Sequence, residues 1–183
     1  VTSIASLSEE AKKSTVVLNG VSKTYSMTGW RIGYAAGPKN IIKAMTNIQS
    51  QSTSNPTSIS QWAAVEAISG PQTEIDKMVA EFVKRRDSIV AGLNAIDGIS
   101  CIKPQGAFYV FPNVSKLFGR KYKGSPIKGS VDLATYLIDE AGIAVVPGEP
   151  FGDDNFIRLS DATSMDQIVQ GVKRIGEAVK ELK

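Results

Sequence analysis

One lysine and one arginine in a glycine-bearing stretch are the residues of this chain best suited to chemistry. The stretch GVSKTYSMTGWRIG, residues 20–33, holds Lys23 and Arg31 among small and hydroxyl-bearing residues. An amine in crowded, partly dry surroundings has a lowered pKa and attacks carbonyl carbons. A guanidinium grips a phosphate or carboxylate with two parallel hydrogen bonds. The pair therefore predicts a ligand that is both an aldehyde and an anion.

That description fits pyridoxal 5'-phosphate (PLP), which carries an aldehyde and a phosphate on one small ring. The hydroxyls of Ser22, Ser26 and Thr28 are candidates for further hydrogen bonds to it. Residue types alone leave a plainer alternative open, because most lysines in polar loops are simply solvated. In that alternative Lys23 is a loop lysine in water and Arg31 is a cation on an edge strand.

Composition narrows the remaining possibilities. The chain has 183 residues, 42% of them hydrophobic, with a net charge of only +3, so it is ordinary globular material and no nucleic-acid surface is expected. The sequence has no histidine, which excludes imidazole metal sites and histidine-based triads within this chain, and we expect no metal. A lone cysteine, Cys101, excludes an internal disulfide and favours a cytoplasmic protein. No apolar run approaches the length of a membrane span, so no membrane partner is expected.

Residue types and apolar spacing in the first part of the chain predict two strands and two helices. The strands are expected over 15–18 and 31–36, and the helices over 40–49 and 59–68. Two strands cannot cover both faces of these helices. The pattern therefore indicates a missing partner, either further sequence or a second subunit.

A long helix is predicted over 73–96, and we expect a domain boundary inside it, near Phe82, which gives domains 1–82 and 83–183. The rest of the chain predicts the order β-β-α-β-β-α, which is typical of an α/β or α+β sandwich. Its expected strands are 99–102, 106–111, 143–146 and 155–160, and its expected helices are 131–141 and 165–182. The basic, aperiodic stretch 116–129 is expected to be a surface loop.

Residues 20–33 resemble the PLP-attachment signature of class I/II aminotransferases, and the chain is most similar to the bacterial aspartate aminotransferases among them. The resemblance covers nearly all of the chain, because further motifs follow in the family's order. These are GAFY at 106–109, VVPG at 145–148 with FG at 151–152, and IRLS at 157–160. The resemblance implies an α/β fold, the C-terminal portion of a fold type I PLP-dependent transferase. The chain would hold the end of the large PLP-binding domain and a complete α+β small domain.

The resemblance also implies roles for individual residues. Lys23 would bind PLP covalently and move a proton between the substrate α-carbon and the cofactor. Arg31 would bind the cofactor phosphate, and Ser22 would contact it. Arg158 would grip the α-carboxylate of an amino-acid or keto-acid substrate. Taken by itself, Arg158 has a plainer alternative as a salt-bridged arginine on an edge strand.

Some positions depart from the family pattern or keep two interpretations. Gly20 stands where members often carry a phosphate-binding serine, and Asp161 stands where close relatives often carry an aromatic residue. Phe108, Tyr109 and Phe111 either line the substrate pocket or pack in the core. Alternation along a strand predicts that at least two of these three pack in the core.

The chain begins without Met, and the family places its other cofactor contacts, including the partner of the pyridine nitrogen, before the lysine. We therefore expect part of a longer, homodimeric enzyme that is inactive as this piece alone. The implied reaction is transamination, with aspartate and 2-oxoglutarate as the favoured pair. The alternatives are another aminotransferase or PLP β-lyase of the same fold, a non-catalytic aminotransferase-like module, and a structural fragment that folds without cofactor.

Overall fold

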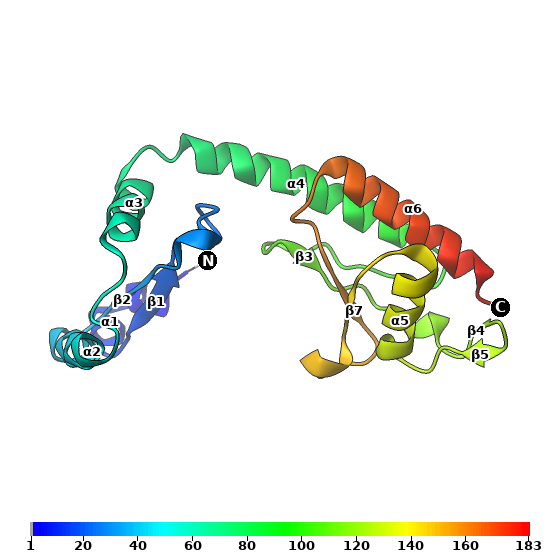
Figure 1. Cartoon of the computed structure of the whole chain (residues 1–183), viewed down its shortest axis with the longest axis horizontal. Helices are drawn as coiled ribbons and strands as arrows, with labels where there is room; N and C mark the ends of the chain where they lie inside the picture. The colour runs from blue at the N-terminus through cyan, green and yellow to red at the C-terminus, as the bar shows by residue number, and fades with distance from the viewer. Residues whose placement is uncertain (1) are drawn as a thin grey trace. The chain divides into compact units, whose positions relative to one another are not determined.

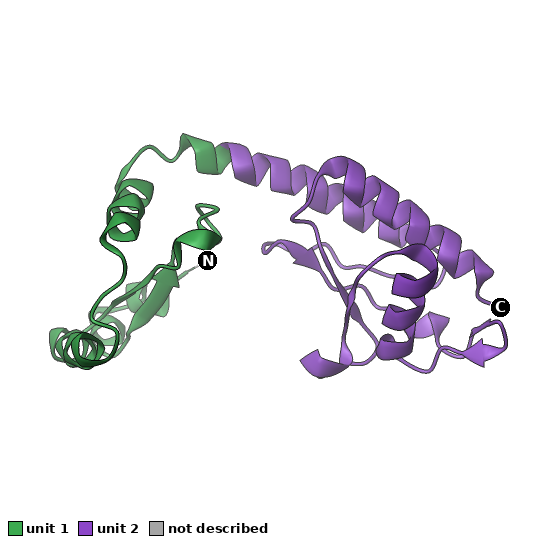
Figure 2. Cartoon of the chain, in the orientation of Figure 1, with its two compact units in different colours: residues 1–76 green, residues 77–183 purple. Residues whose placement is uncertain are grey.

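The chain divides into two compact units, each with its own helices and its own antiparallel strands. A computed structural model describes residues 2–183, and the units comprise residues 1–76 and 77–183 (Figure 2). The division falls inside helix α4 (Thr73–Asn94), the helix in which the sequence places a domain boundary near Phe82.

The first unit contains a two-stranded antiparallel sheet, in which β1 (Val17–Gly20) pairs with β2 (Gly33–Ala36) (Figure 1). Both strands begin later than the predicted ranges 15–18 and 31–36. The prediction that Arg31 starts the second strand is wrong. Its backbone is left-handed, with φ 52° and ψ 48°, which is far from any strand conformation.

The remaining elements of the first unit are helical. They are η1 (Ile4–Ser6), α1 (Glu9–Lys13), η2 (Thr28–Trp30), α2 (Lys39–Ser52) and α3 (Ser58–Ser69). Helices α2 and α3 confirm the predictions over 40–49 and 59–68, and each extends slightly beyond its predicted range.

Little apolar surface of the first unit is covered. Among its described residues, the buried hydrophobic ones are Val21 and Ala64. Large apolar side chains of α2 and α3 lie exposed instead, including Ile48 at 72% and Trp62 at 75%. The apolar face of a helix is normally packed against another element. These two helices therefore present faces that the described residues do not cover, as the sequence leads us to expect.

Helix α4 confirms the prediction of a long helix, and its apolar stripe is buried only in its second half. Ile89, Val90 and Leu93 are buried, whereas Val79, on the same predicted stripe, is 55% exposed. The second half packs against α6 (Met165–Glu181), where a Cβ atom on Gly92 would lie 2.7 Å from Val172 Cγ1 (Figure 1). A glycine there lets the two helices approach closely.

The sheet of the second unit has three antiparallel strands in the order β3-β7-β6. They are β3 (Tyr109–Val110), β6 (Val146–Pro147) and β7 (Ile157–Ser160). All are shorter than the ranges predicted from the sequence. The strand predicted over 99–102 is wrong, because Ser100 makes only an isolated bridge with Asn113.

The stretch 116–129 is more ordered than a plain surface loop. It overlaps η3 (Ser115–Leu117) and contains a hairpin of β4 (Lys121–Tyr122) and β5 (Ser125–Pro126), with Leu117 and Ile127 buried. Helix α5 (Ser130–Ala141) follows, close to its prediction over 131–141. Helix α6 likewise matches its prediction and is capped by the side chain of Ser164, which accepts a hydrogen bond from the Gln167 amide.

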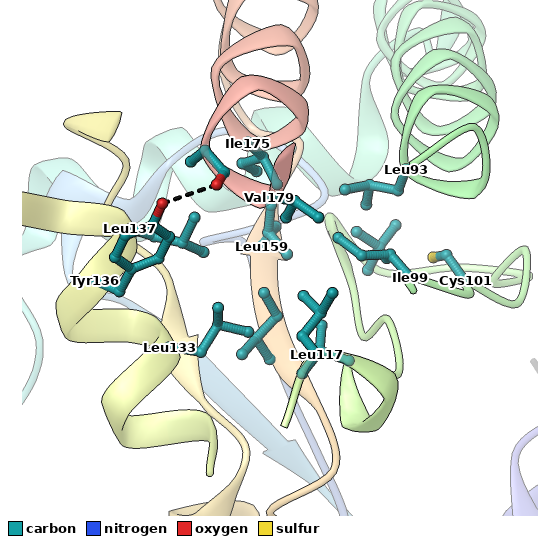
Figure 3. Packing of buried hydrophobic residues seen from close by; sticks show 14 of the residues in the cluster. Leu93, Ile99, Cys101, Leu117, Leu133, Tyr136, Leu137, Leu159, Ile175 and Val179 are labelled. Atoms are coloured by element: carbon teal, nitrogen blue, oxygen red, sulfur yellow. Dashed lines mark hydrogen bonds between the residues drawn. The ribbon is translucent and has the colours of Figure 1, made fainter. Parts of the chain in front are cut away.

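One hydrophobic cluster holds the second unit together (Figure 3). It joins α4, α5, α6 and β7 through side chains such as Leu93, Leu133, Ile175 and Leu159. The hydroxyl of Tyr136 donates a buried 2.8 Å hydrogen bond to the carbonyl oxygen of Ala178, which ties α5 to α6. The sheet is therefore backed by helices on the face that Leu159 occupies.

Replacing Leu133, which is fully buried on α5, tests this core. We expect Leu133→Ala to destabilise the second unit by about 2–5 kcal/mol, because it removes apolar contacts and leaves a cavity. Ile138→Ala, on the same helix but 52% exposed, should change stability by less than about 0.5 kcal/mol. Hydrogen exchange of the amides in α5 and α6 measures both, and equal effects of the two substitutions would contradict the packing described.

Candidate functional site

The loop between β1 and β2 carries Lys23 and Arg31 and is closed at its base by two glycines. Gly20 and Gly33 lie directly opposite each other at the end of the strand ladder. A Cβ atom on Gly33 would lie 3.1 Å from the carbonyl oxygen of Asn19, which is tighter than side chains normally tolerate. Glycine therefore keeps the strands close at the point where the loop leaves the sheet.

Lys23 lies in the first turn of this loop. Val21, fully buried, anchors the turn, and its carbonyl oxygen accepts a hydrogen bond from the Tyr25 amide at 3.3 Å. The carbonyl oxygen of Lys23 accepts one from the Ser26 amide at 3.2 Å. The Lys23 side chain is exposed, and Ser22 beside it is half-buried. The partly dry surroundings that the sequence predicts for Lys23 are thus not formed by the described residues.

Thr28 links the lysine end of the loop to the arginine end. Its hydroxyl donates to the carbonyl oxygen of Ser22 at 3.0 Å, and its carbonyl oxygen accepts from Arg31 Nη1 at 3.1 Å. Ser22, Thr28 and Arg31 are therefore held together by hydrogen bonds within one loop. The Thr28 hydroxyl, considered from the sequence as a ligand contact, donates its proton inside the loop instead.

Two residues of the loop have an unusual backbone conformation. Ser26 and Arg31 have positive φ angles of 54° and 52°, in the left-handed region that residues other than glycine rarely occupy. Such residues cost on the order of 1 kcal/mol or more each and concentrate at ligand-binding and catalytic sites. The strain at Arg31, together with its hydrogen bond to Thr28, makes this loop the leading candidate for a site in the first unit.

Arg158 lies in the second unit, in the central strand β7. The plainer alternative from the sequence, a salt-bridged arginine on an edge strand, does not hold, because β7 lies between β3 and β6. Among the residues that the structure describes, none makes an ion pair or a side-chain hydrogen bond with Arg158. Its guanidinium carbon lies 4.9 Å from the ring centroid of Phe151 and 5.5 Å from that of Tyr109.

Three other arginines of the second unit form ion pairs with acids. Arg85 pairs with Glu81 at 3.2 Å, Arg86 with Asp87 at 2.8 Å, and Arg120 with Asp97 at 2.7 Å. Cation–π contacts such as those of Arg158 contribute about 0.5–2 kcal/mol, depending on desolvation, and leave the N–H donors unused. Arg158 is therefore a half-buried positive charge whose donors remain available to an anion.

The register of the sheet explains why the rings meet this arginine. Tyr109 pairs with Ser160, two residues from Arg158, so Tyr109 and Arg158 share one face of the sheet. Val110, Ile157 and Leu159 are buried on the core side. The prediction that most of the aromatic trio from 108 to 111 packs in the core is wrong. Val110 is the core residue, while Tyr109 is 41% exposed and Phe108 and Phe111 are half-buried.

Asp161, directly after β7, is an acid in an unusual place. It is only 2% exposed, and its Oδ1 atom has no hydrogen-bond partner among the described residues. Burial raises the pKa of the Asp161 carboxyl, while its own backbone amide and the charges of Arg85 and Arg86 oppose that rise. The sequence marks Asp161 as a departure from the family but contains no signal for its burial.

Comparisons with known proteins show which family the chain belongs to. The model of the family "Aminotransferase class I and II" matches residues 1–175. The aspartate aminotransferase of Geobacillus stearothermophilus is 51% identical over 173 residues, which is 94% of this chain and 43% of that protein. A probable aspartate/prephenate aminotransferase of Rickettsia conorii is 50% identical over 96% of this chain and 44% of its own length.

Solved structures give the same result. The crystal structure of the aspartate aminotransferase from Rhizobium meliloti superimposes with a TM-score of 0.96 and 46% identity, over 100% of this chain and 46% of that one. An aromatic aminotransferase from Pyrococcus horikoshii gives a TM-score of 0.86 at 33% identity, over 98% of this chain and 46% of its own.

The chain therefore belongs to the class I and II aminotransferases, and it has the fold of the corresponding part of the aspartate aminotransferases. It spans less than half the length of the relatives it matches. Within residues 2–183, acids and cysteine form no cluster that could hold a metal ion, and no described helix is long and apolar enough to cross a membrane.

The buried carboxyl of Asp161 predicts a pH dependence of stability. Its pKa is raised in the folded state, so its stabilising contribution is complete below the unfolded pKa, at about 4, and is lost as the pH rises through the folded pKa. Relative to Asp161→Asn, the unaltered chain should lose free energy of unfolding as the pH rises from about 4 to neutrality. Urea denaturation followed by circular dichroism measures the difference, and parallel pH profiles would contradict it.

Proposed function

We propose that the complete protein of which this chain forms part is a PLP-dependent aminotransferase, and that it transfers the amino group of aspartate to 2-oxoglutarate. Family membership and the similarity to aspartate aminotransferases support this proposal. The observation that carries it is the closed loop in which Ser22, Thr28 and Arg31 are joined by hydrogen bonds, with Lys23 next to Ser22 in the same loop.

The donor set of this loop fits PLP. A primary amine suits its aldehyde, and a guanidinium suits its phosphate. The strained backbone of Arg31 holds that guanidinium in a fixed part of the loop. PLP, when bound, supplies the electron sink that makes the α-proton of an amino acid removable.

The residues of the chain then have separate tasks. Lys23 would hold the cofactor and later, as a free amine, take the proton from the substrate α-carbon and deliver it to the C4′ carbon of the cofactor. Such positioned acid–base catalysis contributes about 10²–10⁴-fold to the rate. Arg31 and Ser22 would orient the cofactor phosphate. Arg158 would bind the substrate α-carboxylate through both prongs of its guanidinium, because no acid on the described chain competes for them.

We also propose that the complete protein is a homodimer and that this chain alone is inactive. The exposed apolar side chains of α2 and α3 support a missing partner surface, since faces of this kind are normally covered. The exposure of Lys23 supports inactivity, because its amine lacks the dry surroundings that the chemistry requires.

An experiment distinguishes transamination of aspartate from the alternative functions. The similarity to an aromatic aminotransferase keeps a different amino donor open. A PLP β-lyase would share the loop and Arg158. A panel of amino acids with 2-oxoglutarate, assayed for the keto acid formed, distinguishes these enzymes. A non-catalytic module or a structural fragment would give no keto acid with any of them.

Lys23 is the most direct point of test. The complete protein, incubated with PLP and reduced with borohydride, should carry a pyridoxyl group on the peptide that contains Lys23. Lys23→Ala should remove the label and lower transamination by about 10²-fold or more. Mass spectrometry of the digest reads the label, and a keto-acid assay reads the activity.

Lys39 at the start of α2 provides a matched control, since it is also an exposed lysine of the first unit. Lys39→Ala should keep both the label and the activity. A label that persists in Lys23→Ala, or that maps to another lysine, would overturn the site assignment.

A further inference from the structure

We propose that Tyr109 and Phe151 are positioning residues that hold the Arg158 guanidinium between their rings in place of an acidic partner. The inference rests on the proposed function, in which Arg158 binds the substrate carboxylate. Both rings lie within cation–π distance of the guanidinium, at 5.5 Å and 4.9 Å. We call the three residues together the arginine clamp.

A ring and an acid would hold the arginine with different consequences. A carboxylate partner, like those of Arg85 and Arg120, occupies the N–H donors and neutralises the charge. An aromatic ring attracts the cation through its face and leaves the donors at the guanidinium edge unused. An arginine that must bind a carboxylate with both prongs therefore benefits from rings rather than acids.

Phe151 is built into its position. It ends the 3-10 helix η4 (Glu149–Phe151), and the Phe151 amide donates to the Gly148 carbonyl oxygen at 2.8 Å. The hydroxyl of Ser130, a fully buried residue, accepts hydrogen bonds from the Gly148 and Glu149 amides at 3.1 and 3.2 Å. The same hydroxyl donates to Asp154 at 2.6 Å, so this turn is fastened to the start of α5.

Further aromatic rings contact the two rings of the clamp. Phe111 contacts Phe151 edge to face, with centroids 6.1 Å apart, and stacks on Phe156 at 4.9 Å. On the other side, Phe108 meets Tyr109 edge to face at 5.6 Å. The two rings of the clamp are thus held in place by neighbouring rings rather than placed by chance contact with the arginine.

The clamp predicts how Arg158 responds when a ring is removed. In the 183-residue chain labelled with ¹⁵N-arginine, the Nε–Hε group of Arg158 should be ordered, and its resonance is assigned by its loss in Arg158→Lys. Tyr109→Leu and Phe151→Leu should each lower its order parameter and speed its exchange with water. Tyr109→Phe and Phe151→Tyr keep the ring, so the order parameter and the water exchange of the Arg158 Nε–Hε group should stay as in the unaltered chain. This comparison separates loss of the ring from general damage to the fold.

Phe82 supplies the matched control. Its ring also lies under an arginine, Arg85, at 5.3 Å, but Arg85 Nε donates to Glu81 at 3.2 Å. Phe82→Leu should leave the Arg85 Nε–Hε group ordered because the acid still holds it. If the Leu variants of the clamp leave Arg158 as ordered as before, the rings do not position it and the proposal is overturned.

Kinetics of the complete protein provide the second readout. The Leu variants should raise KM for both the amino acid and the keto acid by roughly tenfold and change kcat much less, because the carboxylate contact is made in ground and transition states alike. A fall in kcat with KM unchanged would contradict the clamp. If no variant and not even the unaltered protein transaminates, the proposed function fails, and the resonance of Arg158 still decides whether the clamp exists.

Discussion

A positive charge in the middle strand of a sheet, with no acid paired to it among the described residues, is the feature on which the candidate site of the second unit depends. Arg158 lies between β3 and β6, half-buried, and its contacts within the described chain are the rings of Tyr109 and Phe151. The core side of the same strand is ordinary, with Ile157 and Leu159 buried against helices. One short strand thus separates a packed hydrophobic core from a face that carries a half-buried arginine between aromatic neighbours.

The first unit depends on its loop in a different way. Gly20 and Gly33 bring the two ends of the loop together, and Thr28 fastens Arg31 to the turn that carries Lys23. The loop is therefore held together by its own hydrogen bonds, while its lysine is exposed and α2 and α3 of the same unit carry large exposed apolar side chains.

The sequence predicted the helices well and the strands poorly, for physical reasons. Helices α2, α4, α5 and α6 follow apolar periodicity over ten residues or more, α3 is rich in alanine, and caps such as Ser164 mark where one helix begins. The strands of this chain have two to four residues, too few for alternation to define their ends. Arg31 was misplaced in a strand because nothing in its residue type indicates a left-handed backbone.

The candidate site shows the same division. The signature proposes Lys23, Ser22 and Arg31, and the motif around Arg158 proposes that residue; all four stay predictions. The sequence names Tyr109 as a candidate pocket residue, but it does not predict that Tyr109 and Phe151 contact Arg158, because pairing between β3 and β7 and the turn at Phe151 bring together residues far apart in sequence. The burial of Asp161 likewise depends on packing against α4 that no local pattern encodes.

A crystal structure of the complete protein with PLP and a bound dicarboxylate tests the central claim most directly. We expect continuous density between Lys23 Nζ and the cofactor, the cofactor phosphate on Arg31, and one carboxylate on the edge of an Arg158 that remains between its two rings. Cofactor bound away from Lys23, or a carboxylate bound without contact to Arg158, would contradict the account.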